Sequence, residues 1–306
     1  MRIVVVRPGL LDTIQDLGRP GYRQLGIPEG GAADQGALIR ANRLVGNEDG
    51  EAGIEFTLQG PVLSFPEGCV VSLTGARFEV NRSCRAANWN ETLVLDAGEE
   101  LVLGRALDGC RAYMAVAGGI CIEPVLGSRA TFLPGAFGGL QGRRLKAGDE
   151  LLGGKNQQFR AGKAWVMEQS GPIRVVAGPQ LGNFSEAALL NLFSGDFIVD
   201  AQSDRTGIRL MGPELKSVGR ASLPSQGVLP GAIQVPPDGQ PIILGWDGPV
   251  TGGYPIIAGV IAADLGRAAQ LKPGDRVCFV ALDPEEARQA WVARQSASDR
   301  GITWLA

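Results

Sequence analysis

Histidine is absent from the 306 residues of the sequence. Its absence excludes Ser-His-Asp and Cys-His catalytic arrangements, zinc sites built on imidazole, and imidazole as a general acid or base. Any proton chemistry of this chain must therefore rely on carboxylates, lysine, tyrosine or thiols, or on groups that a partner supplies.

Long apolar runs are also missing, because no stretch of about 18 apolar residues occurs that could span a membrane. Near the start, Arg7, Asp12 and Asp16 interrupt the hydrophobic core that a signal peptide needs. The net charge of −3 argues against electrostatic binding to nucleic acid. We therefore expect a cytoplasmic protein that binds neither membranes nor nucleic acid.

Motifs built on paired cysteines or on phosphate-binding glycines are absent as well. The five cysteines show no CxxC spacing, and their odd number favours reduced thiols over a disulfide framework. Neither a Walker-type P-loop nor a GxGxxG motif before a helix appears, and no lysine has the Met-Lys context of a biotin carrier. The chain thus offers no evident nucleotide, biotin or metal site of its own.

Glycine and proline are abundant, with 45 and 19 residues, and they separate short apolar runs along the whole chain. Many short strands with turn signals between them are typical of β-barrels and β-sandwiches. The length of 306 residues exceeds the usual single core, so two domains are expected. The expected strands include residues 3–6, 62–65, 69–73, 112–117, 173–176, 208–210, 232–235, 242–244 and 276–280.

Helical patterns are few. Residues 34–45 place their apolar side chains on one face, with Asp34 as the expected N-cap. Residues 185–192 begin with a serine cap, and residues 284–294 form an amphipathic pattern. The sequence therefore predicts a mainly β protein with a few short helices.

Two short motifs recur in the two halves. The run FTLQGPVLS at residues 56–64 resembles IRLMGPELK at 208–216, and LKAGDEL at 145–151 resembles LKPGDRV at 271–277. The second motif has turn chemistry that feeds a strand. These echoes favour two copies of one unit, and the polar residues 153–163 are the best linker between them. We expect a first barrel over residues 1–160 and a second over 161–306.

The segment 223–265 is the strongest candidate for a site. Two apolar strands flank a Pro-Pro-Asp-Gly turn, and a glycine-rich loop with Asp247, Thr251 and Tyr254 follows. Gly252 and Gly253 remove side-chain bulk, so a ligand can approach backbone N–H groups closely. From the residues alone, a binding loop and a purely structural loop between strands are equally good interpretations.

Three further clusters combine charges with glycine turns. Residues 13–22 contain Gln15, Asp16 and Arg19, and an arginine can bind a carboxylate or phosphate through two hydrogen bonds. Residues 201–210 contain Ser203, Asp204, Arg205 and Arg209 beside an expected strand, and Glu55 stands in an apolar run. Each has a bland alternative: a structural ion pair in the first two clusters, and a solvent-facing strand residue for Glu55.

Several motifs occur together in one known family, and they extend from about residue 9 to 279: GLLDTIQDLGRPGY, GIPEGGAAD, ANRLVGN, VAGGI, VLGSRAT, SDRTGIRL, GAIQVPPDGQPI, TGGYP and AQLKPGD. The chain resembles the family of 5-oxoprolinase C subunits, also called the KipI-antagonist or allophanate hydrolase subunit 2 family. It is also similar to half of the carboxyltransferase domain of biotin-dependent urea carboxylase. Each motif is weak alone, and the combination is specific.

The resemblance implies two cyclophilin-like β-barrel subdomains in a bacterial cytoplasmic protein. It also implies a KipI-like B subunit and an A subunit as partners, and a complex that opens 5-oxo-L-proline to L-glutamate at the expense of ATP. Within a cleft shared with the B subunit, we expect Arg19 or Arg205 to bind the substrate carboxylate. We expect Asp204 or Asp247 to position a nucleophile or water. We expect Tyr254, as a catalytic residue, and Thr251 to polarise the substrate carbonyl, and Gln234 to bind substrate.

The sequence departs from the family pattern in the glycine-rich region. Gln226 stands where relatives usually have a glutamate, Pro249 and Val250 replace an amide and a hydroxyl residue, and Ile256 replaces a basic residue. An altered substrate or a structural role is therefore an alternative expectation. Two further alternatives stay open: a carboxyltransferase component of a biotin-dependent urea or amide carboxylase, and a non-enzymatic partner of a kinase-inhibitor-like B protein.

Overall fold

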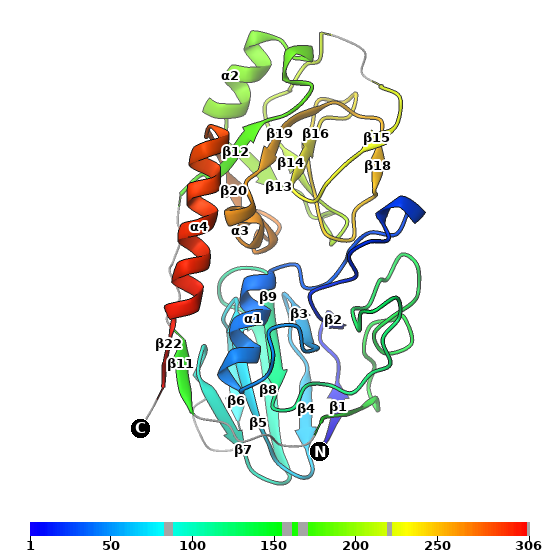
Figure 1. Ribbon diagram of the computed structural model, residues 1–306, viewed down its shortest axis with the longest axis vertical. Coiled ribbons are helices and arrows are strands. Elements are labelled where there is room, and N and C mark those ends of the chain that lie inside the picture. The colour runs from blue at the N-terminus through cyan, green and yellow to red at the C-terminus, as the bar shows by residue number, and fades with distance from the viewer. Residues whose placement is uncertain (83–87, 155–160, 165–170, 219–221, 305–306) are drawn as a thin grey trace. The chain divides into compact units, whose positions relative to one another are not determined.

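The computed structural model describes all 306 residues except 83–87, 155–160, 165–170, 219–221 and 305–306 (Figure 1). The chain divides into two compact units. Unit 1 comprises Met1–Arg19, Gly30–Met167 and Ser298–Ala306, and unit 2 comprises Pro20–Glu29 and Glu168–Ala297. The expected end of the first barrel at residue 160, and most of the expected linker at 153–163, lie outside the described residues.

Unit 1 is built on two five-stranded antiparallel sheets, with strand orders β10-β1-β4-β8-β6 and β2-β3-β9-β5-β7. Their strands are β1 (Arg2–Arg7), β2 (Leu11–Gln15), β3 (Gly53–Thr57), β4 (Val62–Phe65), β5 (Cys69–Gly75), β6 (Phe78–Arg82), β7 (Thr92–Leu95), β8 (Glu99–Ala106), β9 (Arg111–Val116) and β10 (Glu150–Leu152). A third, two-stranded sheet pairs β11 (Gly162–Ala164) with β22 (Ile302–Trp304).

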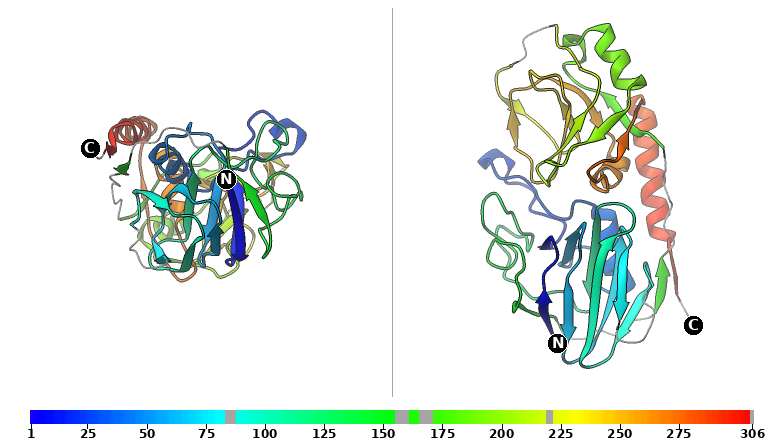
Figure 2. Two further views of the ribbon diagram at one scale, coloured as in Figure 1. Left: turned by 90° about the horizontal axis from the view of Figure 1, so that it is seen from below. Right: turned by 180° about the vertical axis from the view of Figure 1, so that it is seen from behind.

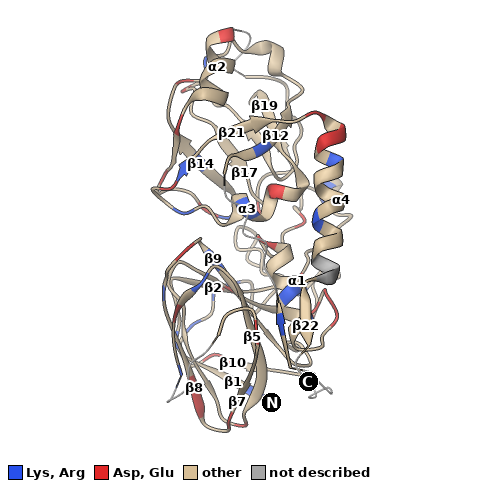
Figure 3. Ribbon diagram, turned by 90° about the vertical axis from the view of Figure 1, so that its left-hand side faces the viewer, with Lys and Arg blue, Asp and Glu red and all other residues tan. Residues whose placement is uncertain are grey.

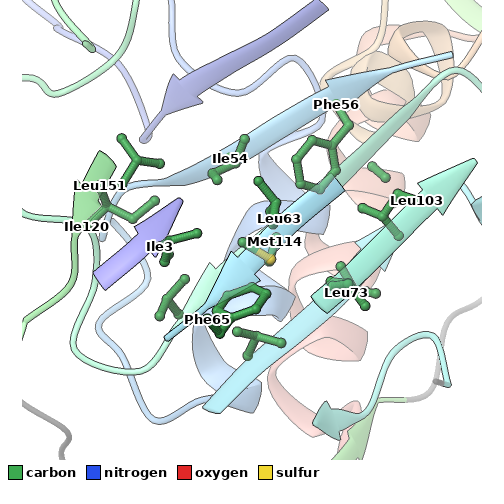
Figure 4. Close-up of a cluster of buried hydrophobic side chains, with 14 of the residues drawn as sticks. Ile3, Ile54, Phe56, Leu63, Phe65, Leu73, Leu103, Met114, Ile120 and Leu151 are labelled. Atoms are coloured by element: carbon green, nitrogen blue, oxygen red, sulfur yellow. The ribbon is translucent and has the colours of Figure 1, made fainter. Parts of the chain in front are cut away.

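The core of unit 1 is filled by alternate residues of both five-stranded sheets. Ile3 and Leu63 come from one sheet and Ile54, Phe56 and Met114 from the other, and all five are fully buried in one cluster (Figure 4). Because side chains alternate between the faces of a strand, the residues between these positions point out of this core. Thr13 on β2, Glu55 on β3 and Tyr113 on β9 are polar residues of this kind, and they are described below.

Helix α1 (Gln35–Leu44) covers part of the opposite face of the second sheet. The hydroxyl groups of Ser72 and Thr74 on β5 donate hydrogen bonds to the carbonyl oxygens of Ala41 and Ala37, each at 2.7 Å. Asp34 caps the helix by accepting a hydrogen bond from the N–H of Ala37 at 3.1 Å. The helix and its cap were both predicted correctly, because periodicity and capping chemistry agree there.

Unit 2 contains an eight-stranded sheet in the order β20-β13-β14-β17-β16-β19-β12-β21. Its pairs are antiparallel except for β12 and β21, which run parallel. A small pair, β15 with β18, lies beside it (Figure 1). The strands are β12 (Ile173–Ala177), β13 (Phe197–Val199), β14 (Gly207–Met211), β15 (Gln226–Gly227), β16 (Ala232–Gln234), β17 (Ile242–Leu244), β18 (Thr251–Gly252), β19 (Ile256–Val260), β20 (Arg276–Val277) and β21 (Phe279–Ala281).

Short helices complete unit 2: α2 (Glu186–Ser194), α3 (Leu265–Ala269) and the longer α4 (Pro284–Arg300), whose last residues belong to unit 1 (Figure 2). Ser185 caps α2 through the N–H of Ala188 at 3.1 Å, as expected. Red, which marks acidic residues, covers the beginning of α4, where Glu285 and Glu286 lie in the first turn (Figure 3). Carboxylates at that end favour the helix dipole.

The repeated Leu-Lys-x-Gly-Asp motif forms the same turn in both units. The carboxylates of Asp149 and Asp275 accept hydrogen bonds from the N–H of Lys146 and Lys272, at 2.8 and 3.0 Å. The carbonyl oxygens of the same aspartates accept from Val5 on β1 and Val199 on β13. Each turn leads into a strand, β10 or β20, that pairs antiparallel with β1 or β13. The echo seen in the sequence is therefore a structural repeat.

The expected architecture is confirmed, since the chain is mainly β, contains two strand-rich units and has few helices. Among the residues that the structure describes, no helix has the length and apolar character needed to cross a membrane.

Candidate functional site in the second unit

The loop after β17 is tied to the turn before β14 by a buried ion pair. The guanidinium group of Arg205 donates two hydrogen bonds to the carboxylate of Asp247, at 2.7 Å from Nε and 3.1 Å from Nη2. Their side chains are only 4% and 1% exposed. Two parallel hydrogen bonds fix the relative orientation of both groups. The structure thus brings together two residues that the sequence singled out separately.

Asp204, next to this pair, shapes the turn. Its Oδ1 accepts hydrogen bonds from the N–H groups of Thr206 at 2.7 Å and Gly207 at 3.0 Å. The hydroxyl of Ser203 accepts from the N–H of Arg209 at 3.0 Å. Both residues therefore hold the turn that presents Arg205 to Asp247, and the side chain of Asp204 is exposed.

Thr251 and Tyr254 lie on the exposed side of the glycine-rich loop. Thr251 begins β18, where its backbone pairs with Gly227 of β15, and its side chain is exposed. Tyr254 follows β18 and is 40% exposed. Both side chains are exposed in this unit, as a role in binding or catalysis requires.

Gln234 is the polar residue of an otherwise apolar strand face. It ends β16, its side chain is 4% exposed, and its Nε2 is without a hydrogen-bond partner among the described residues. A Cβ added to Gly252 would lie 2.4 Å from this Nε2. A side chain at that position would require the carboxamide of Gln234 to move. The expected Gln234 is thus placed against the glycine-rich loop.

Gln180 is a member of this cluster that the sequence did not reveal. Its carboxamide exchanges two hydrogen bonds with that of Gln226 on β15, at 3.1 and 3.2 Å. Its Oε1 also accepts from the N–H of Ile256 at 3.0 Å. Gln180 directly precedes η2 (Leu181–Asn183), and the pairing of β12 with β19 brings it close to Ile256. This contact depends on tertiary pairing, and no motif around Gln180 in the sequence indicated it.

The residues that depart from the family pattern all lie around this cluster. The side chain of Ile256 is 6% exposed and packs in an apolar cluster with Val228, Ala232 and Leu244. Pro249 is exposed, and the carbonyl oxygen of Val250 accepts a hydrogen bond from Val228 at 3.0 Å. Amide groups thus lie beside aliphatic side chains in this cluster.

An early segment of the chain also reaches this cluster. Residues Pro20–Glu29 belong to unit 2, and Arg23, in the short helix η1 (Arg23–Leu25), donates a hydrogen bond to the carbonyl oxygen of Val228. The backbone that follows β15 is thereby fixed from a distant part of the sequence.

The first expected cluster lies in unit 1, where Gln15 donates hydrogen bonds to the hydroxyl of Thr13 at 3.0 Å and the carbonyl oxygen of Thr131 at 3.2 Å. Asp16 accepts hydrogen bonds from the N–H of Gly18 at 2.7 Å, the hydroxyl of Ser128 at 2.7 Å and the N–H of Arg129 at 2.6 Å. Arg19 is 1% exposed, donates to the carbonyl oxygen of Ala130, and stacks 5.0 Å from the ring centre of Phe137. These contacts favour a structural role for both residues.

Glu55 lies in a buried row of polar residues and does not face the solvent. Strand register places Thr13, Glu55, Tyr113 and Thr74 side by side across β2, β3, β9 and β5. The phenol of Tyr113 donates to Glu55 at 2.8 Å and accepts from the N–H of Asp34 at 2.7 Å. Complete burial raises the pKa of Tyr113 well above its ordinary value, so it remains a donor. The solvent-facing interpretation of Glu55 was wrong, because α1 and its preceding loop cover this face.

Asp12 points into the core of unit 1 and is 1% exposed. Burial raises its pKa to about 7, although the hydrogen bond from the N–H of Gly9 partly opposes this shift. This carboxyl group lies in unit 1.

Among the described residues, no group of three or more Cys, Asp or Glu side chains could hold a metal ion. In unit 2 the arrangement instead offers accessible hydroxyl groups, a buried carboxamide and glycine backbone. Such groups can orient a small neutral ligand through hydrogen bonds.

The chain is similar in sequence to a protein family and to several named proteins. Residues 25–281 match the family described as carboxyltransferase domain, subdomain A and B. The chain is 40% identical over 288 residues to the C subunit of 5-oxoprolinase from Escherichia coli, covering 94% of this chain and 93% of that protein. It is 36% identical over 277 residues to the C subunit of 5-oxoprolinase from Haemophilus influenzae, covering 90% and 89%.

Among solved structures, the urea carboxylase of Kluyveromyces lactis is similar with a TM-score of 0.92 and 32% identity. That match covers 98% of this chain but only 29% of the carboxylase chain. The chain therefore belongs to the carboxyltransferase-domain family of subdomains A and B, and it is similar along almost its whole length to two 5-oxoprolinase C subunits.

Proposed function

We propose that this chain is the C subunit of an ATP-dependent 5-oxoprolinase. Together with an A subunit and a KipI-like B subunit, it would open 5-oxo-L-proline to L-glutamate in the cytoplasm. The observation that carries the proposal is the 40% identity to a 5-oxoprolinase C subunit over 94% of this chain and 93% of that protein. A match along nearly the full length of both chains supports a shared role as well as a shared fold.

In this proposal the second unit contributes the substrate contacts. Opening the lactam adds water across its amide bond, so negative charge develops on the carbonyl oxygen before the C–N bond breaks. The hydroxyl groups of Thr251 and Tyr254 are exposed on one loop and can donate to that oxygen. Arg205 and Asp247 are paired with each other through two hydrogen bonds, so we assign them a role in positioning this loop.

ATP enters the proposal only through the partner subunits. The described residues contain no cluster of acidic or thiol side chains suited to a divalent metal, and the sequence has no P-loop.

Reconstitution tests the proposal. The purified chain is combined with A and B subunits, and 5-oxoproline-dependent ATP hydrolysis and glutamate formation are measured together. We expect both activities to require this chain and to fall in Tyr254→Phe, while the exposed control Arg276→Ala stays at the wild-type level. Full activity without this chain would overturn the proposal.

A second candidate is carboxyl transfer from biotin to a urea-like amide. It is favoured by the match of residues 25–281 to a carboxyltransferase domain and by the structural similarity to a urea carboxylase. Biotin would then reside on a separate carrier protein. This candidate predicts bicarbonate-dependent carboxylation that avidin abolishes, whereas lactam opening by the first candidate is insensitive to avidin.

A stable complex with a B-type partner and no turnover of either kind would instead indicate a regulatory protein.

A further inference from the structure

The small sheet that carries Thr251 is too short to be stable alone. β15 and β18 have two residues each, Gln226–Gly227 and Thr251–Gly252, and they pair with each other. Two more backbone hydrogen bonds, one on each side of this ladder, join the same two segments. A two-stranded ladder is at best marginally stable in water. Contacts from other parts of the chain must therefore help to fix where the side chains of Thr251 and Tyr254 lie.

Gln180, which directly precedes η2, makes such contacts with two strands at once. Its carboxamide exchanges two hydrogen bonds with that of Gln226 on β15, at 3.1 and 3.2 Å. Its Oε1 accepts a hydrogen bond from the N–H of Ile256, the first residue of β19, at 3.0 Å. Its own N–H donates to the carbonyl oxygen of Ile256 at 3.2 Å. Gln180 thus binds both β15 and the backbone two residues after Tyr254.

Gly178 allows the segment before η2 to lie this close to β19. A Cβ on Gly178 would be 2.3 Å from the carbonyl oxygen of Ile256, so a side chain here would require the backbone of β19 to move. The N–H of Gly178 donates to the carbonyl oxygen of Ile257 at 3.0 Å. The place of Gln180 is therefore set by backbone contacts and not only by its own side chain.

The N–H of Ile256 decides how the two carboxamides are oriented. Because a backbone N–H can only donate, the atom of Gln180 that faces it must be the oxygen. The NH2 group of Gln180 then faces the oxygen of Gln226, and Gln226 directs its own NH2 group to Gln180. Loss of the Gln180 carboxamide therefore removes the side-chain partner of Gln226 and an acceptor of Ile256 together.

We propose that Gln180 is a positioning residue that fixes Thr251 and Tyr254 by anchoring β15 and the start of β19. The use of these two side chains in lactam opening rests on the proposed function, whereas the anchoring rests on the contacts of Gln180. Asp247 is fixed by Arg205 at the beginning of the same loop, and Gln180 fixes its end. Groups that are ordered before the reaction need not be ordered during it, so the anchoring adds to the rate.

Fluorine NMR of the full-length chain with 3-fluorotyrosine tests the anchoring. The sequence has three tyrosines, and the signal of Tyr254 is the one that Tyr254→Phe removes. Methionine is close to glutamine in shape and has no amide, so Gln180→Met should shift this signal toward its position in the urea-unfolded chain. The signal of the buried Tyr113 in unit 1 should stay in place. An unchanged Tyr254 signal in Gln180→Met would overturn the proposal.

A second variant keeps the test valid if Gln180→Met folds poorly. Gln180→Glu can still accept from the N–H of Ile256 and from the NH2 group of Gln226, and it loses only the bond that Gln180 donates. Its effect on the Tyr254 signal should therefore be smaller than that of Gln180→Met. An effect as large as that of Gln180→Met would show that these accepted hydrogen bonds do not anchor the loop.

Gln240 provides a matched control in the same unit. Its carboxamide accepts from the N–H of Gly212 at 2.8 Å and donates to the carbonyl oxygen of Gly212 at 3.3 Å. Gln240→Met should leave the Tyr254 signal in place, since neither β15 nor β19 loses a contact. Equal shifts in Gln240→Met and Gln180→Met would indicate a general loss of stability and refute a specific positioning role.

Activity of the reconstituted complex distinguishes this inference from the proposed function. Gln180→Met should lower kcat for 5-oxoproline at least about tenfold with a smaller change in KM, because the positioned hydroxyl groups act on charge that develops after binding. The same substitution should lower kcat less in a Tyr254→Phe background, where one positioned group is already missing.

The two kinds of measurement fail separately. If the wild-type complex opens 5-oxoproline and Gln180→Met has an unchanged kcat, the role of Gln180 is refuted and the function stands. If the fluorine signals shift as described but the wild-type complex does not turn over 5-oxoproline, the anchoring by Gln180 stands and the proposed function fails.

Discussion

At the scale of single residues, Asp12 links the fold of unit 1 to pH. Its carboxyl has an ordinary pKa of 3.8, and burial raises the pKa to about 7 in the folded chain. Between these values the folded state holds one proton more than the unfolded state. The stability that this proton contributes is fully present below pH 3.8 and is lost as the pH rises through about 7.

We therefore expect Asp12→Asn to remove a pH dependence that the wild type shows. Asparagine is neutral at every pH and can still accept the hydrogen bond from Gly9. Relative to this variant, the wild type should lose up to about 1.4 kcal/mol of unfolding free energy per pH unit between pH 5 and 7. Urea unfolding at several pH values measures this, with the exposed Asp196→Asn as control. Parallel pH profiles of wild type and Asp12→Asn would contradict the assignment.

The Arg205 and Asp247 pair gives a second prediction at this scale. Removing one partner leaves a buried charge without compensation, so Asp247→Ala should lower the free energy of unfolding by about 3–5 kcal/mol. The pair of Arg276 and Asp196 is 77% and 58% exposed, and Asp196→Ala should cost less than about 1 kcal/mol. Chemical denaturation compares the two. Similar losses of unfolding free energy in Asp247→Ala and Asp196→Ala would show that the buried pair contributes no more to stability than the exposed one.

At the scale of elements, the repeated turn before β10 and β20 provides an internal control. Gly148 and Gly274 have φ values of +84° and +89°, and a Cβ on either would meet nothing within 4 Å. Alanine at either position therefore adds backbone strain without a clash, and each variant should lose about 1–2 kcal/mol of unfolding free energy. Asparagine, which tolerates this conformation, should restore part of the loss. Very different losses at the two positions would argue against equivalent turns.

The elements that could be predicted from sequence are those in which two local signals agree. Helices α1 and α2 follow the N-cap residues Asp34 and Ser185, and an apolar period comes directly after each cap. Helix α3 has only five residues, too few for a period, and it was not predicted. Strand β15 has two residues, Gln226 and Gly227, and exists only through its pairing with β18.

The candidate site was predictable in its residue types and not in its contacts. Arg205 and Asp247 stood out because charged side chains lie beside glycine turns, whereas Gln234 was named only through the family resemblance. Their partners depend on pairing between distant segments, since Asp247 bonds to Arg205 across 42 residues and Gln226 to Gln180 across 46. Tertiary register decides such contacts, and no local pattern encodes it.

At the scale of the whole molecule, each unit has its own hydrophobic core, which predicts separate responses to core substitutions. Phe65 is fully buried in the core of unit 1, and Phe197 is fully buried in that of unit 2. Truncation to alanine should cost about 3–5 kcal/mol at either site. Hydrogen exchange monitored by mass spectrometry should then show faster exchange mainly in the unit that carries the substitution. Uniform acceleration throughout the chain in both variants would indicate a single cooperative unit.

The pairing of β11 with β22 has a consequence for biosynthesis. Residues Gly162–Ala164 emerge from the ribosome before most of unit 2, whereas their partners Ile302–Trp304 emerge after Glu168–Ala297. During that interval β11 exposes an unpaired strand edge, which is a template for wrong pairing. Unit 1 therefore cannot finish folding in the order of translation, and its last step waits for residues made after its neighbour. A nascent chain halted before residue 302 would carry this open edge, and chaperones that recognise unpaired strands would meet it there.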